Sequence, residues 1–544
     1  MIFKNLVIYI NQFYIFSEKK FRELYLYSDI YDKKISKFND KNLEYKPSPI
    51  LLNCIIKNKN RKNKIEDFYL SSIWDDKKIK KKDYNNLHSF FWLFSLDLKS
   101  SKKDTQKIIL NWINSNKKYD SNNWDIDILS KRVIAWISNS KLTYEDSDQT
   151  YKNKINYMIL KQINHLIIEI KKTNWTDNKI IGCAAIILAG LSYGEKSKYL
   201  EFGFSLLKKI IKYGLDNEGF PKSRNIKQLN LYLKYFVLIR EWLKESQTEI
   251  PEYIDEAIYY FGQAYFLTSQ NINNTILFNG NYEETNEDIN KYLTRLGYTF
   301  KNENNEIGGY AILKNKKISL IMDIGSSPEK KNSGDYQAGA LSFEIISNDK
   351  KLICNSGYYK NFKHQLNYLS KSTASHSSLT IDNHSSCKIK KNKDGSSKIE
   401  RGLKITNKSI IFEKNYWSVM SEHDGYSKKY GIIHNRQIEF FADQNKFLGT
   451  DKLIKKRNFK KSNFEIRFHL MPNTKVMKTQ NNESIFIELE NEGWKFTCDN
   501  HIIDIESGLF LGKKNSYKEN QNIFISGMTH KENQIIKWEL IKIT

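Results

Sequence analysis

Apolar residues recur at helical spacing from about Leu87 to Ser269. Positions three or four residues apart share one face of an α-helix. One such stripe consists of Ile155, Ile159, Ile163, Leu166 and Ile170. The run Gly182–Leu191 is small and apolar on every side, which predicts an inner helix surrounded by others. Short polar breaks separate the successive helices, so this part of the chain predicts helix–turn–helix units in a curved or closed array.

The hydrophobic period changes after about Ser269. From there to Ile543, short apolar segments alternate with polar or glycine-containing turns, a pattern typical of β-strands. Clear examples are Ile318–Asp323, Ala340–Ile346, Ser378–Ile381, Gln437–Phe441 and Phe464–Leu470. Many such strands in succession favour a long antiparallel β-sandwich.

A run of helices followed by a run of strands predicts two domains of different class. The chain has 544 residues, which is too long for one ordinary hydrophobic core. Its apolar content of 40% and aromatic content of 13% are enough to build two cores. We therefore predict a helical domain over residues 1–285 and a β-sandwich domain over residues 286–544.

The net charge of +25 is the most unusual global property of the chain. It would suit an acidic partner such as nucleic acid, an anionic polysaccharide or an anionic membrane surface. The basic residues are spread along the chain and are mostly lysine, whereas arginine is expected where a protein reads phosphates or bases. A general bias of composition toward lysine, asparagine, isoleucine and tyrosine explains the charge more simply, and we favour it.

No stretch approaches the length of a membrane span. The start of the chain, Met1–Phe16, is partly apolar, but Asn11 and Gln12 interrupt it and no small-residue cleavage site follows, so no signal peptide is predicted. The five cysteines are far apart and lack C-x-x-C spacing, which predicts buried free thiols and neither a disulfide framework nor a zinc ribbon.

An ordered set of motifs connects the second half of the chain with a known family. It consists of Ala338–Glu344 (AGALSFE), Leu352–Gly357, Ser372–Ser377, Glu422–Tyr426, Gly431–Arg436 (GIIHNR) and Arg467–His469. In this order and spacing the motifs resemble the heparinase II/III-like family, in its bacterial branch with an α-helical toroid ahead of the sandwich. The resemblance extends into the helical part through Trp124, Arg132, Trp136, Ala184–Leu191 and Asp216–Asn225. It implies an incomplete (α/α) toroid followed by an antiparallel β-sandwich, over roughly Leu87 to Ile543.

The resemblance also implies a reaction, the β-elimination of acidic polysaccharides. One group must neutralise the uronate carboxylate so that its α-proton becomes acidic, a base must take that proton, and an acid must protonate the leaving glycosidic oxygen. Lyases of the family use Asn or Arg, His and Tyr for these tasks, in a cleft between toroid and sandwich. The expected partner is therefore an acidic polysaccharide.

The chain departs from the family at these positions. The family's Asn-His pair falls on Asp177-Asn178, its Tyr-His pair on Lys227-Gln228, and its catalytic His ahead of the ALSFE strand on Asp335.

The ligands of the structural zinc found in some members fall on Gln337, Asn355 and His376, and only His376 is kept. Two amides and one imidazole are poor ligands for Zn²⁺, so we predict no metal and no cofactor.

Other residues are candidates for acid–base chemistry. His423 stands beside Asp424, which could orient it, and Tyr426 could donate a proton. The alternative is a turn, because Asp-Gly is a strong hairpin signal, with Asp424 as its cap and Tyr426 packed beneath. The predicted catalytic set is His423, Tyr426, Asp335 and His376. For His376 we slightly favour a structural role in which it bridges turn carbonyls, because its metal partners are missing.

Six residues are candidates for substrate binding. His434 and Arg436 should return on the strand next to His423, where Arg436 could bind a carboxylate bidentately. Arg224 and Lys227 would hold a uronate at the start of a helix, or else form a solvated basic turn.

Trp124 and Arg132 lie at helical spacing with Trp136. They could stack on a sugar and bind its carboxylate, but such a stripe is more often core with a snorkelling arginine, which we favour.

The leading hypothesis is thus a polysaccharide lyase-like enzyme acting on a uronate-containing glycan. A catalytically degenerate glycan-binding protein of the same fold is the alternative, favoured by the missing Asn, Tyr and His. A basic nucleic-acid-binding protein ranks third, because the net charge alone suggests it and no recognised binding motif supports it.

Overall fold

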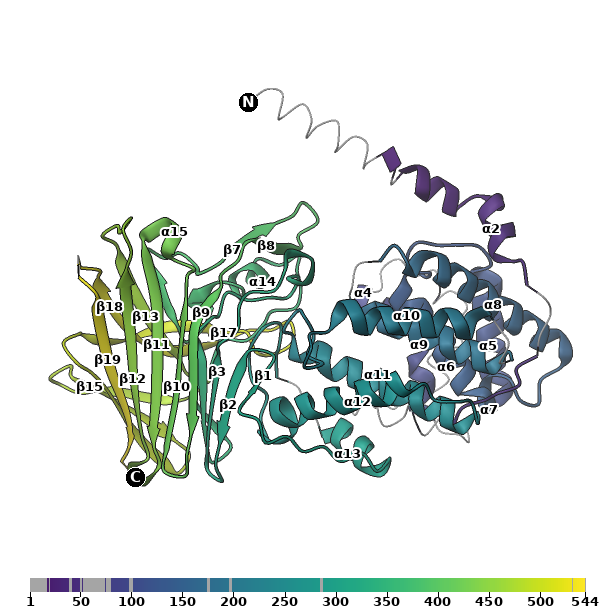
Figure 1. Ribbon diagram of the computed structural model, residues 1–544. Coiled ribbons are helices and arrows are strands. Elements are labelled where there is room, and N and C mark those ends of the chain that lie inside the picture. The colour runs from purple at the N-terminus through teal and green to yellow at the C-terminus, as the bar shows by residue number, and fades with distance from the viewer. Residues whose placement is uncertain are drawn as a thin grey trace. The chain divides into compact units, whose positions relative to one another are not determined.

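The computed structural model describes residues 17–18, 20–38, 42–48, 51, 74, 80–96, 101–173, 177–194, 198–283, 287–530 and 532–543. Met1–Phe16 and Cys54 lie outside the described residues. The chain forms two compact units (Figure 1). The helical unit comprises residues 1–212 and 234–256, and the sandwich unit comprises residues 213–233 and 257–544. The domain boundary predicted between residues 285 and 286 stays a prediction.

Helices account for the described structure up to Arg295, as the hydrophobic pattern predicts. They are α2 (Asp29–Ile35), α4 (Lys81–Ser89), α5 (Lys102–Ser115), α6 (Ile126–Ser138), α7 (Ser140–Thr143), α8 (Gln149–Ile170), α9 (Asp177–Ser192), α10 (Lys198–Gly214), α11 (Ile226–Glu245), α12 (Glu252–Tyr265) and α13 (Glu287–Arg295), with a 3-10 helix at Phe91–Ser95 and a π-helical turn at Phe266–Gln270. Side-chain caps begin several of them: Ser101 accepts from the Asp104 amide, and Asp148 accepts from the Tyr151 amide.

Helix α9 is the inner helix predicted over Gly182–Leu191. Every residue from Lys179 to Ser192 is buried, and the helix packs against α6 and α8. The predicted stripe on α8 faces the same interior, since all five of its residues are buried. Small side chains let α9 approach its neighbours closely: a Cβ on Gly182 would come within 2.5 Å of the Ile170 side chain. Among the described residues, no helix is both long and apolar enough to cross a bilayer.

In the residues that the structure describes, nineteen strands follow, and all of their pairings are antiparallel. They are β1 (Glu306–Ile307), β2 (Tyr310–Lys314), β3 (Ile318–Asp323), β4 (Phe343–Ser347), β5 (Lys350–Ile353), β6 (Leu379–Ile381), β7 (Lys388–Lys391), β8 (Ser397–Arg401), β9 (Ile405–Phe412), β10 (Tyr416–His423), β11 (Ile432–Phe441), β12 (Lys446–Lys455), β13 (Asn463–His469), β14 (Lys475–Lys478), β15 (Ser484–Leu489), β16 (Glu492–Cys498), β17 (Ile503–Phe510), β18 (Lys518–Met528) and β19 (Gln534–Lys542). Two short helices, α14 (Gln365–Leu369) and α15 (Ser427–Tyr430), interrupt them.

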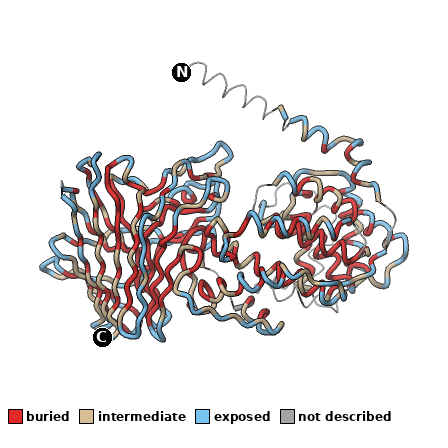
Figure 2. Tube along the Cα trace, in the orientation of Figure 1, coloured by how far each residue is buried: buried red, intermediate tan, exposed pale blue. Residues whose placement is uncertain are grey.

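The strands form three main sheets and one hairpin. The sheets have the orders β1-β2-β3-β4-β5, β14-β15-β16-β19-β12-β11-β10-β9 and β17-β18-β13-β6, and β7 pairs with β8 alone. One continuous apolar core lies between the three sheets, where the buried stretches of the strands gather (Figure 2). In it the ring of Phe343 stacks on that of Trp538, with 5.5 Å between the ring centres. Fully burying such a side chain stabilises the fold by roughly 1.5–3 kcal/mol. The loops at the sheet ends carry the polar groups described next.

Candidate functional site

A polar cluster in the sandwich unit surrounds the exposed carboxylate of Asp335, in the loop between β3 and β4. The hydroxyl of Tyr358 donates to Asp335 Oδ1 at 2.7 Å, and the amide of Asn225 lies 3.4 Å from Oδ2. The Lys371 amine lies close enough to interact electrostatically with the same carboxylate. We call Asn225, Asp335, Tyr358 and Lys371 the Asp335 cluster.

Backbone contacts hold these four side chains in place. Asn225 caps α11, because its Oδ1 accepts from the amide of Lys227 at 2.9 Å. Gly280, with a φ of +83°, lets the chain pass close by: a Cβ there would lie 2.5 Å from Asn225 Nδ2 and 2.9 Å from Asp335 Cβ. Only glycine fits both that φ and that space.

The electrostatics of the cluster keep its groups in defined protonation states. Burial raises the pKa of Tyr358 well above its usual value, and the neighbouring carboxylate of Asp335 raises it further, so the phenol stays a proton donor. Burial lowers the pKa of Lys371 to about 8, against the opposing effect of Asp335. The Lys371 amine donates to the carbonyl of Gly334 and to Ser397 Oγ at 2.8 Å, so it has no carboxylate as a hydrogen-bond partner.

This arrangement can move a proton and balance a charge. Asp335 offers an exposed carboxylate whose orientation the Tyr358 hydroxyl holds, and such a group can act as a general base. The Asn225 amide and the Lys371 ammonium stand beside it, and groups of this kind stabilise negative charge that develops on a substrate.

A pocket of about 590 Å³ lies next to the cluster, and Lys371 lines it. Its other walls come from α14, the β7–β8 hairpin, the turn after β10 and α15. We call it the hairpin pocket. Tyr426, predicted as a proton donor, lines it with its side chain largely buried, and its hydroxyl donates to the Leu379 carbonyl at 2.7 Å.

His423, His434 and Arg436 come together, but in the interior of the sandwich. His423 and His434 are paired across β10 and β11, and all three side chains are buried. Arg436 binds a carboxylate through two nitrogens, as predicted, but the carboxylate is that of buried Asp451, at 2.7 and 3.1 Å.

His434 Nε2 lies 2.6 Å from the same carboxylate. Burial lowers the pKa of His423 and of His434, so both rings are neutral. With no exposed surface, these residues have structural roles here and stand apart from the Asp335 cluster.

Gln337, Asn355 and His376, the positions matched to the zinc ligands of some family members, form hydrogen bonds within the protein. Asn355 Oδ1 accepts from the Ser377 amide at 2.9 Å. Gln337 accepts from the Gly280 amide and donates to the carbonyls of Gly357 and Ser370. His376 is buried, with Nδ1 2.8 Å from the Ser372 carbonyl, and so it bridges a turn instead of lining a cleft. In the part of the chain that the structure describes, no group of three or more His, Cys, Asp or Glu side chains could hold a metal.

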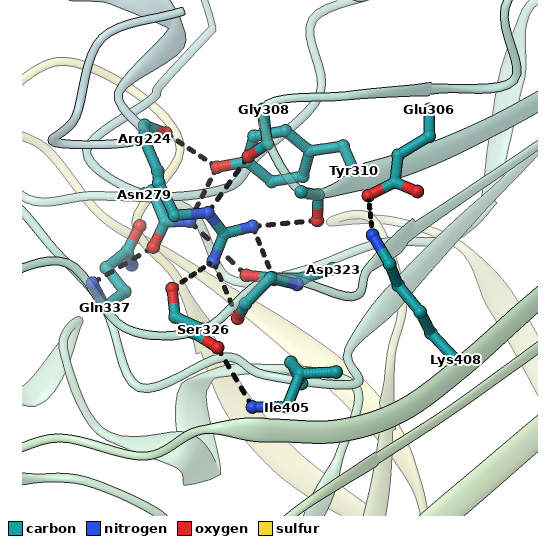
Figure 3. A network of polar contacts seen from close by, with 12 residues as sticks. Arg224, Asn279, Glu306, Gly308, Tyr310, Asp323, Ser326, Gln337, Ile405 and Lys408 are labelled. Atoms are coloured by element: carbon teal, nitrogen blue, oxygen red, sulfur yellow. Dashed lines mark hydrogen bonds and ion pairs between the residues drawn. The ribbon is translucent and has the colours of Figure 1, made fainter. Parts of the chain in front are cut away.

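Arg224 is buried, and its guanidinium donors all face protein acceptors (Figure 3). It donates to the carbonyls of Gly308, Gly309 and Gly325 at 2.9–3.1 Å and to Asp323 Oδ1 at 2.7 Å. Its φ of +59° lies in the left-handed region, a strain that these contacts maintain. Arg224 therefore fastens residues 213–233 to the first sheet instead of presenting a charge to a ligand.

The remaining predicted binding residues lie elsewhere. Lys227 is half-buried, with its amine 3.1 Å from the centre of the Tyr282 ring. Trp124 and Arg132 belong to the core of the helical unit. Arg132 donates to Gln162 and to the carbonyls of His88 and Asn123, and its guanidinium lies over the Trp112 ring at 4.2 Å. This is the core arrangement that the helical spacing favours.

The sequence points to Asp335 as a site residue but not to the three side chains around it. Asn225 ends the motif Asp216–Asn225, Tyr358 directly follows Leu352–Gly357, and Lys371 directly precedes Ser372–Ser377. The three partners of Asp335 thus stand at the ends of the motifs or directly beside them, where closer attention to the sequence could have singled them out.

Comparisons with known proteins identify this architecture. Residues 304–539 match the family model "Heparinase II/III-like, C-terminal". A crystal structure of heparinase III is similar with a TM-score of 0.67 and 14% identity, covering 94% of this chain and 88% of that one. A mutant form of the heparan sulfate lyase HepC of Pedobacter heparinus is similar with a TM-score of 0.65 and 13% identity, covering 88% of this chain and 79% of that one. A heparinase III with methylated lysines is similar with a TM-score of 0.65 and 12% identity, covering 90% of this chain and 81% of that one.

A search of curated protein sequences finds no match. The structural likeness establishes the fold, and the predicted fold class is confirmed: a helical N-terminal region followed by antiparallel sheets.

Proposed function

We propose, from the premise that residues 304–539 of this chain are a heparinase II/III-like C-terminal domain, that the protein is a polysaccharide lyase for an acidic, uronate-containing glycan. One observation carries the proposal: an exposed carboxylate, Asp335, accepts a 2.7 Å hydrogen bond from a buried tyrosine beside an amide and a lysine. Proteins of the same fold are a heparan sulfate lyase and heparinases, which supports an acidic polysaccharide as the substrate.

The reaction would proceed by β-elimination at the cluster. Lys371 and Asn225 offset the negative charge of the uronate as its α-proton leaves. Asp335 takes that proton while the electron pair forms the new carbon–carbon double bond and the glycosidic carbon–oxygen bond breaks. The protonated Asp335 then passes the proton to the leaving oxygen, and Tyr358 keeps the carboxylate oriented throughout.

The proposal is tested with the purified full chain and a panel of uronic-acid polymers, by following the ultraviolet absorbance of unsaturated uronate products. We expect Asp335→Asn to lower kcat by about 10²–10⁴-fold, the usual contribution of a general base. Tyr358→Phe should lower kcat less, because it removes only the group that orients the base. Asp349→Asn and Tyr517→Phe, at exposed positions, are the matched controls and should leave the rate unchanged.

A non-catalytic glycan-binding protein is the second candidate. The observation that favours it is that Asp177-Asn178, Lys227-Gln228 and Asp335 stand where the family has its Asn, Tyr and His. It predicts saturable glycan binding with no unsaturated product at high protein concentration. Product formation that is equal in wild type and Asp335→Asn would instead reject the Asp335 cluster as the catalytic site.

A further inference from the structure

We propose that the hairpin pocket is a second anion-binding subsite, which takes a carboxylate or sulfate group of the glycan. That the ligand is a glycan rests on the proposed function. That the bound group is an anion rests on the residues that line the pocket. Its volume of about 590 Å³ lies within the usual range of roughly 300–1,000 Å³ for small-ligand pockets. That volume can hold a sugar ring together with its charged substituent.

The charge of the lining points to an anion. Four basic side chains, those of Lys371, Lys388, Arg401 and Lys429, line the pocket, and the described lining residues include no carboxylate. The chain as a whole has 62 acidic against 87 basic residues, so a lining without acids is not simply its average composition. Cations gathered in a concave site raise the local concentration of anions.

Two of these cations, Arg401 and Lys429, have no carboxylate partner among the described residues, and the hydrogen bonds of Lys371 go to neutral groups. Lys371 donates to a carbonyl and a serine hydroxyl, and the Lys429 amine lies 2.5 Å from His384 Nε2. Arg401 forms no ion pair in the described part of the chain. Lys388 forms an ion pair with Glu400 on the paired strand, at 2.5 Å. A bound oxyanion would accept charge-assisted hydrogen bonds from the other basic side chains of the lining.

Two tyrosines give the pocket walls suited to a sugar. Tyr368 on α14 has 44% of its surface exposed and is held by a hydrogen bond to the Ile389 carbonyl at 3.2 Å. Tyr430 on α15 also lines the pocket, with its hydroxyl 2.8 Å from His384 Nδ1. Aromatic walls with a few placed polar groups are typical of ligand pockets. Lys371 belongs to both sites, so one glycan chain could contact the pocket and Asp335 together.

The test compares Arg401→Gln/Lys429→Gln with Lys390→Gln, in the full chain. Lys390 is on the same hairpin, is exposed and does not line the pocket, so it controls for the loss of charge. Binding is measured by calorimetry with a sulfated uronate oligosaccharide, with its desulfated counterpart and with inorganic sulfate. Equal thermal unfolding midpoints confirm that the variants are folded.

We expect the double variant to bind the oligosaccharide at least tenfold more weakly and Lys390→Gln to bind as wild type. A loss seen only with the sulfated sugar identifies sulfate as the bound group, and a loss with both identifies the carboxylate. With turnover, KM should rise while kcat stays near that of wild type, because the pocket contributes binding alone. Wild-type affinity in the double variant would overturn the proposal, as would equal pocket-dependent binding of single-stranded RNA.

The two proposals fail in different ways. Pocket-dependent binding without any unsaturated product would support this inference and remove the lyase activity. Product formation with a KM unaffected by the double variant would do the reverse.

Discussion

At the scale of single residues, charged side chains in this protein serve two distinct purposes. Arg224 and Arg436 are buried, and both donate hydrogen bonds to backbone carbonyls. Arg224 also pairs with Asp323, and Arg436 pairs with Asp451. Asp335 is exposed, with its carboxylate held by the Tyr358 hydroxyl and the Asn225 amide. A buried ion pair of this kind is weak evidence for net stability, but breaking it leaves an uncompensated charge in the interior.

The fork of Arg224 gives a prediction about stability. Arg224→Lys keeps the charge but replaces a planar fork by a single point donor, so the carbonyls of Gly308, Gly309 and Gly325 cannot all be satisfied. We expect the free energy of unfolding to fall by about 2–4 kcal/mol, from several lost hydrogen bonds to a charged group. Chemical denaturation measures it. Arg457→Lys, at an exposed position, should change nothing, and an equal loss in both variants would contradict the prediction.

At the scale of elements, the alternation of residues along a strand predicts which side chains share a face of the sheet. It does not predict which of the two faces meets solvent. His434 and Arg436 do return beside His423, as expected, because β10 and β11 pair in register. Their shared face is the core, since Ile432, Ile438 and Phe440 on the same face of β11 belong to the apolar core of the sandwich. The apolar periodicity of a strand does not tell which of its faces other elements cover. This depends on contacts between residues far apart in sequence, such as those of Arg436 with the carbonyls of Leu341 and Ser377.

The same limit explains how the candidate site was only partly predicted. Asp335 could be proposed because it lies just ahead of the motif Ala338–Glu344. Its partners Asn225 and Tyr358 come from other loops, and only the folded chain brings those loops together. The strands and helices, by contrast, follow from local apolar spacing and were predicted in the right order.

The loop at Gly280 yields a prediction at this scale. Gly280→Ala adds a methyl that would lie 2.5 Å from Asn225 Nδ2 and 2.9 Å from Asp335 Cβ, so it should displace the Asp335 cluster and lower the proposed lyase rate at least tenfold. Gly297→Ala is a matched control, with a φ of +80° and no atom within 4 Å of the added methyl. Both variants carry the strain of a left-handed backbone, about 1 kcal/mol. Equal rates in the two would show that the clash is harmless.

At the scale of the whole molecule, buried imidazoles set its response to acid. Burial lowers the pKa of His88, His165 and His469 to about 3 each and that of His376 to about 4. Burial also lowers the pKa values of the paired His423 and His434 in the sandwich core. In the unfolded chain these rings take up protons near pH 6.5, whereas in the folded chain they stay neutral to much lower pH.

The sign of the effect follows directly. Below about pH 6.5 the unfolded state binds more protons than the folded state, so stability falls as the pH falls toward 4, by up to about 1.4 kcal/mol per pH unit for each ring. We expect the thermal midpoint to drop steeply across this window. His469→Gln removes one group that takes up a proton on unfolding, so the thermal midpoint should fall less steeply with pH. His530→Gln, at an exposed position, should leave this slope unchanged. A midpoint that does not change between pH 6.5 and 4 would contradict the account.

The attachment of Arg224 to the first sheet also bears on how the chain can be made and divided. Residues 213–233 leave the ribosome well before Gly308, Gly325 and Asp323, their partners in the sandwich unit. The Arg224 guanidinium therefore lacks these partners until the later strands are synthesised. A fragment that begins at residue 286 would bury the carboxylate of Asp323 without its cation. The sandwich unit is thus discontinuous in sequence, and a fragment meant to fold alone has to contain both of its pieces.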